Sequence, residues 1–286
     1  MVEQIVPLTF PRPHGPLAAI VIPVFNNSLY TFNCLLSVLR NTEDVPYEVI
    51  VVDDASTDDT QSMLAKIDNV RVETNPRNMG FVQTCNSGAR RATGKYVVFL
   101  NNDTQVHRGW LSALVRVAEN DSSVGMVGAK LLFPDGRLQE AGGIIWRDAS
   151  AWNYGRLDDP TKPEYNYARE VDYCSAACLL VRRDLFERIG GFDLLFAPAY
   201  YEDTDLAFAA RKMGYRVVYQ PDAIVTHFEG VTAGTDTSTG TKRFQEVNRQ
   251  KFREKWRDVL ETQHAPIGGG AIAALERRGV NHQARL

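Results

Sequence analysis

Near its start the chain carries the run Leu17-Ala-Ala-Ile-Val-Ile-Pro-Val-Phe25, which is almost wholly apolar. A continuous apolar run of this length is typical of a strand that is buried on both faces of a parallel sheet. Asn26-Asn27-Ser28 supplies turn and helix-capping residues, so we expect a helix from there to about Arg40. The run Glu48-Val-Ile-Val-Val-Asp-Asp54 predicts the next strand, which ends in two acids.

Helix and strand patterns continue to alternate up to about residue 120. A helix capped at 56–59 is expected to reach about residue 68, and short strands are predicted at 70–74 and 95–100, with a helix at 80–93 between them. This alternation indicates right-handed βαβ units. Ligands of such sheets bind beyond the carboxyl ends of the strands. The polar clusters at those ends are therefore expected to converge, and they are Asn26-Asn27, Asp53-Asp54 and Asn101-Asn102-Asp103.

The second half of the chain has a less regular pattern. Residues 124–133 and the mixed apolar run 171–181 predict strands, and the latter leads into a helix at 184–189. Apolar spacing predicts a helix at 202–213, followed by short strands at 215–219 and 223–228. The final expected elements are a Gly/Thr-rich loop at 230–240 and a helix at 241–260.

Composition excludes several classes of protein. The 286 residues include 32 Lys and Arg and 35 Asp and Glu, which gives a formal net charge of −3. This balance argues against a nucleic-acid binder and against a polybasic membrane-surface protein. The cysteines form no CxxC pair or zinc-type cluster. Few cysteines in a large chain, with no secretory signal and no apolar run long enough to span a membrane, predict a reduced, cytoplasmic protein.

Two of the strand-end clusters carry groups that nucleotide sites use. A carboxylate beside amides, as in Asn101-Asn102-Asp103, can hold a divalent cation that also binds phosphate oxygens, although a plain polar turn has the same pattern. Asp53 or Asp54 could accept hydrogen bonds from a ribose or a nucleobase; the alternative is an acid favoured by a helix dipole. No GxxxxGK[ST] occurs and no GxGxxG follows the first strand, so P-loop and dinucleotide-binding interpretations lack support.

Two further candidates lie in the second half of the chain. Tyr201-Glu-Asp-Thr-Asp205 opens a predicted helix with three acids. The helix dipole explains part of this pattern, but a carboxylate in a sheltered pocket can also serve as a general base. His227 ends a predicted strand just before the Gly/Thr-rich loop, which makes it a candidate ligand, although a lone histidine is more often structural.

Taken in chain order, these motifs resemble a family 2 glycosyltransferase with a GT-A fold, of the rhamnosyltransferase-like type that builds bacterial surface polysaccharides. The motifs of the nucleotide-sugar half are Ile20-Val-Ile-Pro-Val-Phe-Asn26, Val51-Val-Asp-Asp-Ala-Ser-Thr-Asp-Asp-Thr60, Asn75-Pro-Arg-Asn-Met-Gly-Phe81 and Phe99-Leu-Asn-Asn-Asp-Thr104. Those of the acceptor half are Gly190-Gly-Phe-Asp193, Tyr201-Glu-Asp-Thr-Asp205 and His227. Each motif alone is weak, but their order and spacing together are specific.

The resemblance implies an α/β fold: a Rossmann-like, mostly parallel central sheet flanked by helices, a smaller acceptor-side sheet and a C-terminal helix. It implies one domain over residues 17–260, divided into a nucleotide-sugar half at 17–120 and an acceptor half at 121–260. Residues 1–16 would be an N-terminal extension, and residues 261–286 a C-terminal tail or linker.

The resemblance also implies roles for individual residues. Asp203 would be the general base and Glu202 would position the acceptor or the base. Asp103 and His227 would be ligands of Mn²⁺ or Mg²⁺, and Asn101 departs from the family's DxD acid pair. The residues expected to bind the nucleotide sugar are Pro23, Phe25, Asn26, Asp54, Asn78, Gly80, Asn102, Asp103 and Lys242.

The implied reaction is an inverting, metal-dependent transfer of a sugar from a UDP-, dTDP- or GDP-linked donor to a hydroxyl of a glycan or lipid-linked glycan. Its setting would be the synthesis of O-antigen or capsule, with no nucleic-acid partner. Attachment to the cytoplasmic face of the inner membrane and fusion to further enzyme domains both stay open. The alternative is a catalytically impaired sugar-nucleotide-binding module of a larger enzyme. The loop at 230–240 would be either a lid over the donor or a plain surface linker.

Aromatic residues in and beside the polar segment 147–170 admit two interpretations. Packing under a long loop accounts for most of them, and stacking against acceptor sugar rings for one or two. They are Trp146, Trp152, Tyr154, Tyr165 and Tyr167.

Overall fold

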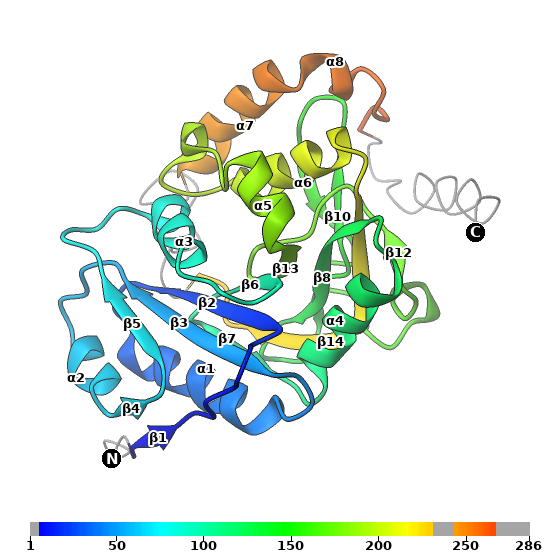
Figure 1. Cartoon of the computed structure of the whole chain (residues 1–286). Helices are drawn as coiled ribbons and strands as arrows, with labels where there is room; N and C mark the ends of the chain where they lie inside the picture. Colours follow the sequence, from blue (N-terminus) through cyan, green and yellow to red (C-terminus); the bar gives the residue numbers. More distant parts are fainter. Residues whose placement is uncertain (1–5, 231–242, 267–286) are drawn as a thin grey trace.

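The computed structural model describes residues 6–230 and 243–266. These residues form three layers, with helices on both faces of a central ten-stranded sheet (Figure 1). The main path through the sheet runs β12-β14-β8-β13-β6-β2-β3-β5. In chain order its strands are β2 (Ala18–Val24), β3 (Tyr47–Asp53), β5 (Arg71–Thr74), β6 (Tyr96–Leu100), β8 (Val124–Leu132), β12 (Arg169–Glu170), β13 (Cys178–Arg182) and β14 (Arg216–His227).

Shorter strands extend this framework. β7 (Thr104–Val106) pairs with β14, and β9 (Leu138–Glu140) pairs with β8. β1 (Leu8–Thr9) pairs with β4 (Ile67–Asp68), and β10 (Gly143–Ile145) pairs with β11 (Ala151–Asn153) in a small antiparallel sheet.

The first half of the chain has the predicted parallel architecture. β2 pairs in parallel with both β3 and β6, and β3 pairs in parallel with β5. Every residue of β2 is buried, because helices cover the sheet on both sides. An all-apolar strand is stable only in such a position, where it removes both of its faces from water. The predicted α/β fold class, with parallel strands flanked by helices, is therefore confirmed.

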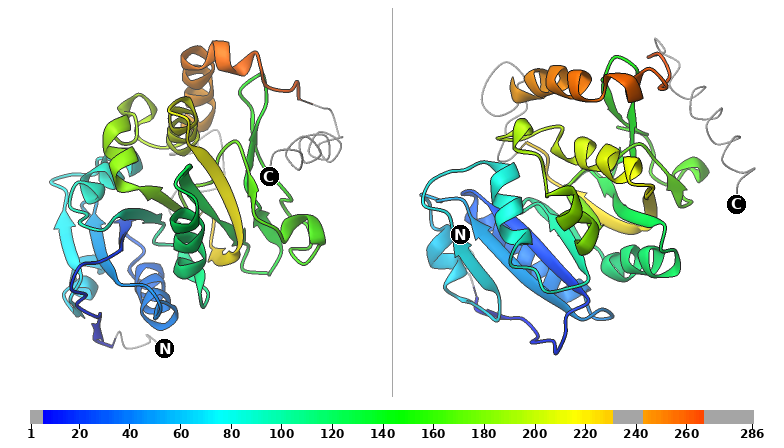
Figure 2. Two further views of the ribbon diagram at one scale, coloured as in Figure 1. Left: turned by 45° about the vertical axis from the view of Figure 1, so that its right-hand side comes forward. Right: turned by 45° about the horizontal axis from the view of Figure 1, so that its top comes forward.

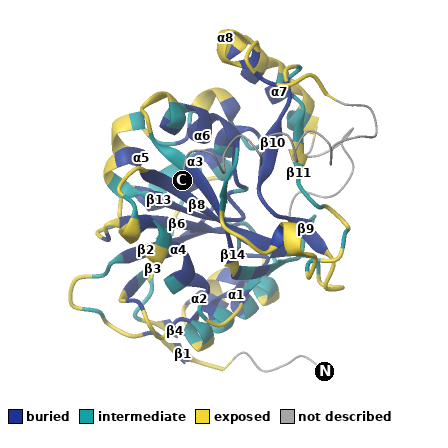
Figure 3. Cartoon of the chain, turned by 90° about the vertical axis from the view of Figure 1, so that its right-hand side faces the viewer, coloured by how far each residue is buried: buried dark blue, intermediate teal, exposed yellow. Residues whose placement is uncertain are grey.

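The helices divide between the two faces of the sheet (Figure 2). One apolar core lies under α1 (Ser28–Asn41), α2 (Thr60–Leu64) and α4 (Trp110–Asn120). The other lies under α3 (Phe81–Ala89), α5 (Arg183–Ile189) and α6 (Glu202–Lys212). α7 (Phe244–Lys255) and α8 (Arg257–Leu260) pack outside α6, with their outer sides exposed (Figure 3). Two 3₁₀ turns, η1 (Pro163–Tyr165) and η2 (Leu194–Phe196), lie in the connections.

Several sequence predictions of element bounds were wrong. The helix expected to reach residue 68 ends at Leu64, because residues 67–68 form β4 and pair with β1. The expected N-terminal extension thus packs on the domain, with Leu8 and Phe10 in the core. The two strands expected at 215–228 are one strand, β14, with an irregularity between Gln220 and Ile224. The helix expected at 241–260 is divided between α7 and α8 within its described part.

The apolar run at 171–181 also behaves differently from its prediction. Only its second part, from Cys178, forms β13, which runs antiparallel between β6 and β8. Val171 N–H still donates to Val217 O of β14, but residues 172–177 leave this sheet because their backbone groups bind elsewhere: Asp172 N–H donates to Gly143 O, and the amides of Ser175 and Ala176 donate to carboxylates. This non-sheet stretch becomes part of the site.

Candidate active site

A cavity of about 620 Å³ lies beyond the carboxyl ends of β2, β3 and β6, where the sheet topology places ligands. Its walls come from both halves of the chain. The predicted site residues that line it are Pro23, Phe25, Asp54, Asn78, Gly80, Asn102, Asp103, Glu202, Asp203 and His227. Asn26 instead holds the adjoining loop, since its Oδ1 accepts a hydrogen bond from Thr57 N–H at 2.7 Å. Lys242 and residues 231–240 of the predicted lid lie outside the described residues.

Asp54 organises the loop at residues 75–80, which forms one wall of the cavity. It is 4% exposed, and its Oδ1 accepts hydrogen bonds from Asn75 Nδ2 and Met79 N–H, both at 2.7 Å. Its Oδ2 accepts from Gly80 N–H at 2.9 Å. Gly80 has φ +81°, and a Cβ there would lie 2.6 Å from Pro198 Cβ, so only glycine fits. Asp54 thus has a structural role whether or not it contacts a nucleobase.

We expect Asp54→Ala to lower the free energy of unfolding by about 1–3 kcal/mol, because it removes the buried carboxylate that accepts hydrogen bonds from three partly buried donors of the 75–80 loop. Donor binding should weaken as well, since the 75–80 loop loses its anchor. Chemical denaturation measures the first effect. Asp44→Ala, at an exposed position, is the matched control and should change stability by less than about 0.5 kcal/mol. An Asp54→Ala variant as stable as this control would contradict the anchoring role.

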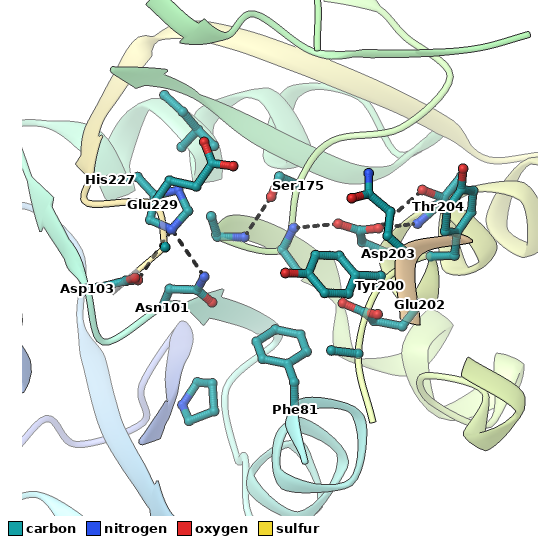
Figure 4. Close-up of a pocket in the computed structure, with 18 of the residues that line it drawn as sticks. Phe81, Asn101, Asp103, Ser175, Tyr200, Glu202, Asp203, Thr204, His227 and Glu229 are labelled. Atoms are coloured by element: carbon teal, nitrogen blue, oxygen red, sulfur yellow. Dashed lines mark hydrogen bonds and ion pairs between the residues drawn. The ribbon is translucent and has the colours of Figure 1, made fainter. Parts of the chain in front are cut away.

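Asp103 and His227 meet on one wall of the cavity (Figure 4). His227 Nε2 lies 3.3 Å from Asp103 Oδ1; the Asp103 side chain is buried and the His227 side chain is 12% exposed. His227 Nδ1 lies 2.7 Å from Gln139 Oε1, a pure acceptor, so Nδ1 carries the proton. In a neutral imidazole the lone pair is then on Nε2, the nitrogen that faces Asp103. This is the tautomer that a metal ligand requires.

These residues fit a divalent cation that is shared with a substrate. Asn101 Oδ1 is buried and has no hydrogen-bond partner among the described residues, so a further oxygen is free beside Asp103 and His227. Within the same residues, no group of three or more His, Cys, Asp and Glu side chains is arranged to hold a metal. A Mg²⁺-type ion is usually held by one or two carboxylates together with substrate phosphates. An ion that is bound partly by substrate phosphates needs only a few ligands from the protein, and the residues at this position can provide them.

Asn102 takes a different position in the same turn. Its Nδ2 donates to Thr31 Oγ1 of α1 at 3.0 Å, which ties the turn after β6 to the first helix. Asn102 is 6% exposed and lines the cavity. Contact with a ribose or phosphate stays a prediction for this residue.

Asp203 and Glu202 lie at the start of α6, on the other side of the cavity from His227 (Figure 4). Asp203 Oδ2 accepts a hydrogen bond from Ala176 N–H at 3.1 Å, and Oδ1 accepts from Thr204 N–H at 2.7 Å. Burial raises the pKa of Asp203, and these hydrogen bonds oppose the rise. Hydrogen bonds from Ala176 N–H and Thr204 N–H therefore stabilise the ionised form of the Asp203 carboxyl group.

Glu202 has the opposite environment. Its Oε2 is buried and unpartnered within the described part of the chain. Burial, together with the negative charge of Asp203, raises the pKa of Glu202 well above its ordinary value. When two adjacent carboxyls compete for one proton, the one with fewer donors keeps it. We infer that Glu202 is the neutral acid of the pair and Asp203 the anion; their catalytic roles stay predictions.

Contacts from the C-terminal helices hold this acidic segment in place. Asp205 is 3% exposed, and its carboxylate accepts hydrogen bonds from Lys255 Nζ and Trp256 Nε1. Asn248 of α7 donates to the carbonyls of Phe196, Ala199 and Tyr200. Asp205 therefore orients the helix and does not line the cavity.

The structure adds residues to the cavity wall that the sequence did not indicate. Gln139 and Glu140 belong to the short strand β9, and Ser175 and Ala176 to the stretch that leaves the sheet. Gln139 follows a Pro-Asp-Gly turn and carries no motif, so only the β8–β9 pairing could have revealed it.

The aromatic residues in and beside the segment 147–170 lie in different environments, and stacking against a sugar stays a prediction. Trp146 and Tyr165 are buried and pack in the core, whereas Trp152 is 45% exposed and lines the cavity. Tyr154 packs edge-on against Tyr165, and Tyr167 is exposed. Trp152 is thus the member of this set positioned to contact a ligand.

No helix within 6–230 or 243–266 combines the length and the apolar content that crossing a bilayer requires. The site lies in an α/β domain, in a cavity at the end of the sheet. On one side of this cavity is Asp203, whose carboxylate accepts a hydrogen bond from Ala176 N–H, and on the other side is the Asp103–His227 pair. That fold and cavity define a glycosyltransferase of the GT-A type.

The chain belongs to glycosyl transferase family 2, whose model matches residues 19–190. It is 29% identical over 236 residues to the O-antigen biosynthesis protein RfbC of Myxococcus xanthus, covering 79% of this chain and 18% of that protein. It is 27% identical over 231 residues to the N-acetylglucosaminyl-diphospho-decaprenol L-rhamnosyltransferase of Mycobacterium tuberculosis, covering 71% and 74%. The chain spans less than a third of the length of the first relatives it matches, 30% and 18%.

Solved structures share the fold. A structure of GalNAc-T7 with UDP, GalNAc and Mn²⁺ superposes with a TM-score of 0.68 at 17% identity, covering 86% of this chain and 50% of the other. The mannosyltransferase PcManGT of Pyrobaculum calidifontis, with GDP-Man and Mn²⁺, gives a TM-score of 0.58 at 19% identity, covering 92% and 68%. At this level of identity the likeness concerns the fold alone.

Proposed function

We propose that this chain is an inverting, metal-dependent glycosyltransferase that moves a sugar from a nucleotide-diphosphate donor to a hydroxyl of a glycan acceptor. The observation that carries the proposal is the pairing of two chemically distinct sides in one cavity. Asp203, with three hydrogen-bond donors to its carboxylate, lies across from the Asp103–His227 pair (Figure 4).

The proposed chemistry is a single displacement. Asp203 accepts the proton of the acceptor hydroxyl while that oxygen forms a bond to the anomeric carbon. The bond from that carbon to the diphosphate oxygen breaks, and its electron pair leaves with the nucleoside diphosphate. Attack opposite the leaving group inverts the anomeric configuration. Asp103 and His227 would hold Mn²⁺ or Mg²⁺, which neutralises charge on the leaving diphosphate when bound.

The remaining assignments rest on position in the cavity. Asp54 would contact the nucleobase, with Pro23 and Phe25 beside it, and Glu202 would position the acceptor. Asn78, Gly80 and Asn102 would complete the donor side, since they line the same cavity. Asn26 would contribute indirectly, by accepting the hydrogen bond from Thr57 N–H that holds the adjoining loop. Lys242 remains a proposed diphosphate contact, on a segment that the structure does not describe.

Relatives named for O-antigen biosynthesis and for rhamnosyl transfer to a lipid-linked sugar support a role in bacterial surface polysaccharide synthesis. Structural neighbours with UDP and GDP-Man support UDP- or GDP-linked donors, and a dTDP-linked sugar is a third candidate. We propose residues 17–260 as one catalytic domain that works on the cytoplasmic side of the membrane, on a glycan or lipid-linked glycan, alone or fused to further enzyme domains.

A thermal-shift screen tests this proposal. UDP, dTDP and GDP, and their common sugars, are each added with Mn²⁺ or with EDTA. We expect one nucleotide series to raise the melting temperature with Mn²⁺, because a ligand present at 100 times its dissociation constant stabilises a fold by about 2.7 kcal/mol. Stabilisation that is unchanged by EDTA would remove the metal assignment. Absence of any shift across the panel would contradict nucleotide-sugar binding.

Release of nucleoside diphosphate separates the proposal from its alternative. The replacement of the first DxD acid by Asn101 is the observation that favours a catalytically impaired sugar-nucleotide-binding module. Such a module would show the thermal shift without hydrolysing or transferring the donor. An active enzyme shows the shift together with slow donor hydrolysis, which coupled detection of the released diphosphate measures.

A further inference from the structure

Glu140 is a buried carboxyl group in the cavity wall that the proposed reaction does not use. It ends β9, is 1% exposed and lines the same cavity as Asp203. Its strand pairs with β8, where Glu140 lies opposite Leu131. The position is therefore set by the sheet and not by a mobile loop.

Only one of the two oxygens of the Glu140 carboxyl group has a hydrogen-bond partner among the described residues. Glu140 Oε1 accepts a hydrogen bond from Ser175 N–H at 2.9 Å. Oε2 is buried and has no partner among the described residues. A buried polar atom without a partner costs about 1–3 kcal/mol, so native proteins seldom keep one without a use. Because Glu140 itself lines the cavity, this unsatisfied oxygen needs only a side-chain rotation to serve a bound ligand.

The groups around Glu140 favour its neutral form. Burial raises the pKa of Glu140 to about 8, and the negative charges of Asp203 and Glu229 add to the rise. The Ser175 amide and the Arg156 guanidinium act in the opposite direction. The other titratable groups within electrostatic reach are Tyr173, Cys174 and Tyr219, and burial raises the pKa of each, so they stay uncharged near neutral pH. Near neutral pH, Oε2 therefore carries a proton and can donate it in a hydrogen bond.

The backbone places Glu140 on the acceptor side of the cavity. Ser175 N–H binds Glu140, and the next amide, Ala176 N–H, binds Asp203. Consecutive Cα atoms are about 3.8 Å apart, so two carboxyl groups held by consecutive amides lie near each other. A sugar that places one hydroxyl at Asp203 therefore has other oxygens within the neighbourhood of Glu140.

We propose that Glu140 is a neutral acid that donates a hydrogen bond from Oε2 to an oxygen of the acceptor sugar and so positions the reacting hydroxyl at Asp203. The inference rests on the proposed function, because it assigns the acceptor subsite of that reaction. It makes Glu140 a binding residue for the acceptor and leaves the donor side unaffected.

The test compares two substitutions of similar size. Glu140→Gln keeps a neutral hydrogen-bonding side chain, whereas Glu140→Leu removes hydrogen bonding. With a panel of octyl glycosides as acceptors, and the one with the fastest wild-type turnover chosen, E140L should raise the acceptor KM by about threefold to tenfold. E140Q should stay within about twofold, and both should keep the wild-type donor dissociation constant. Glu254→Gln, an exposed position on α7, is the control.

Other results overturn the proposal. Loss of activity in E140Q as large as in E140L would mean that Glu140 works as an anion. Weakened donor binding in both variants would move Glu140 to the donor side. Equal KM values in all proteins would remove the acceptor contact.

A measurement without activity tests the protonation state by itself. Glu140 holds its proton in the folded state up to about pH 8, whereas an unfolded glutamic acid, with a pKa of 4.5, releases it earlier. The wild type should therefore lose stability relative to E140Q as pH rises from about 5 to 8. Thermal unfolding in EDTA measures the difference. If no donor supports transfer in the wild type, the proposed function fails, while parallel pH curves for wild type and E140Q would specifically reject the neutral acid.

Discussion

Asp203→Asn should lower the rate of sugar transfer by about 10²- to 10⁴-fold, the range that a positioned general base contributes. Asparagine preserves the size of the side chain, and its single carbonyl oxygen can still accept one of the two backbone hydrogen bonds, from Ala176 or from Thr204, so the fold should remain largely intact. It cannot accept a proton from the acceptor hydroxyl. The loss should appear in kcat, with the thermal shift by donor and Mn²⁺ retained.

Glu202→Gln is the matched comparison for this variant. Glu202 is the neutral acid of the pair, so an amide replaces it with little change of charge. We expect a loss of at most about tenfold, well short of the Asp203→Asn effect. If the two losses are reversed, Glu202 is the base and the assignment from hydrogen-bond donors is wrong. Near-normal turnover in Asp203→Asn would remove it as the base altogether.

The pH dependence of the transfer rate is a second test of Asp203 as the general base. Asp203 must be ionised to accept a proton, and burial raises its pKa above the ordinary value of 3.8. Activity should therefore fall on the acid side at a higher pH than for an exposed aspartate. A rate profile that stays flat down to pH 4 would contradict this.

Asp103→Ala should reduce Mn²⁺-dependent transfer by about 100-fold or more, because it removes one of the two protein ligands that we propose for the metal. Charge neutralisation of a leaving diphosphate by a metal is worth several kcal/mol, and each 1.36 kcal/mol is about tenfold in rate. The concentration of Mn²⁺ that gives half-maximal activity should rise in parallel. His227→Ala should have the same signature, since the two side chains lie 3.3 Å apart.

The control for these variants is Asp135→Ala, an exposed acid in the turn after β8. It removes one negative charge without touching the cavity, so it accounts for any general effect of charge on the binding of Mn²⁺ or nucleotide. Equal Mn²⁺ dependence in Asp103→Ala and this control would show that Asp103 is not a ligand. Rescue of Asp103→Ala at high Mn²⁺ would support the assignment.

Much of the donor side could be predicted from local sequence. Residues after β2, β3 and β6 were expected to converge because parallel strands bring their carboxyl ends to one edge, and Phe25, Asp54 and Asp103 line the cavity there. The predictions that went wrong concern tertiary pairing. Residues 67–68 were expected to end a helix, but pairing with β1 makes them a strand.

The sequence by itself determined the alternation of buried strands and helices, and with it the residues at the strand ends, because apolar periodicity is a local property. Tertiary structure alone decided the chemical state of those residues. Gln139 sets the tautomer of His227 from 88 residues away, and Ala176 supports the Asp203 carboxylate from 27 residues away. Ser175 similarly holds Glu140 across 35 residues. Protonation depends on which donors and charges surround a group, and those neighbours are brought together only when distant segments fold against one another.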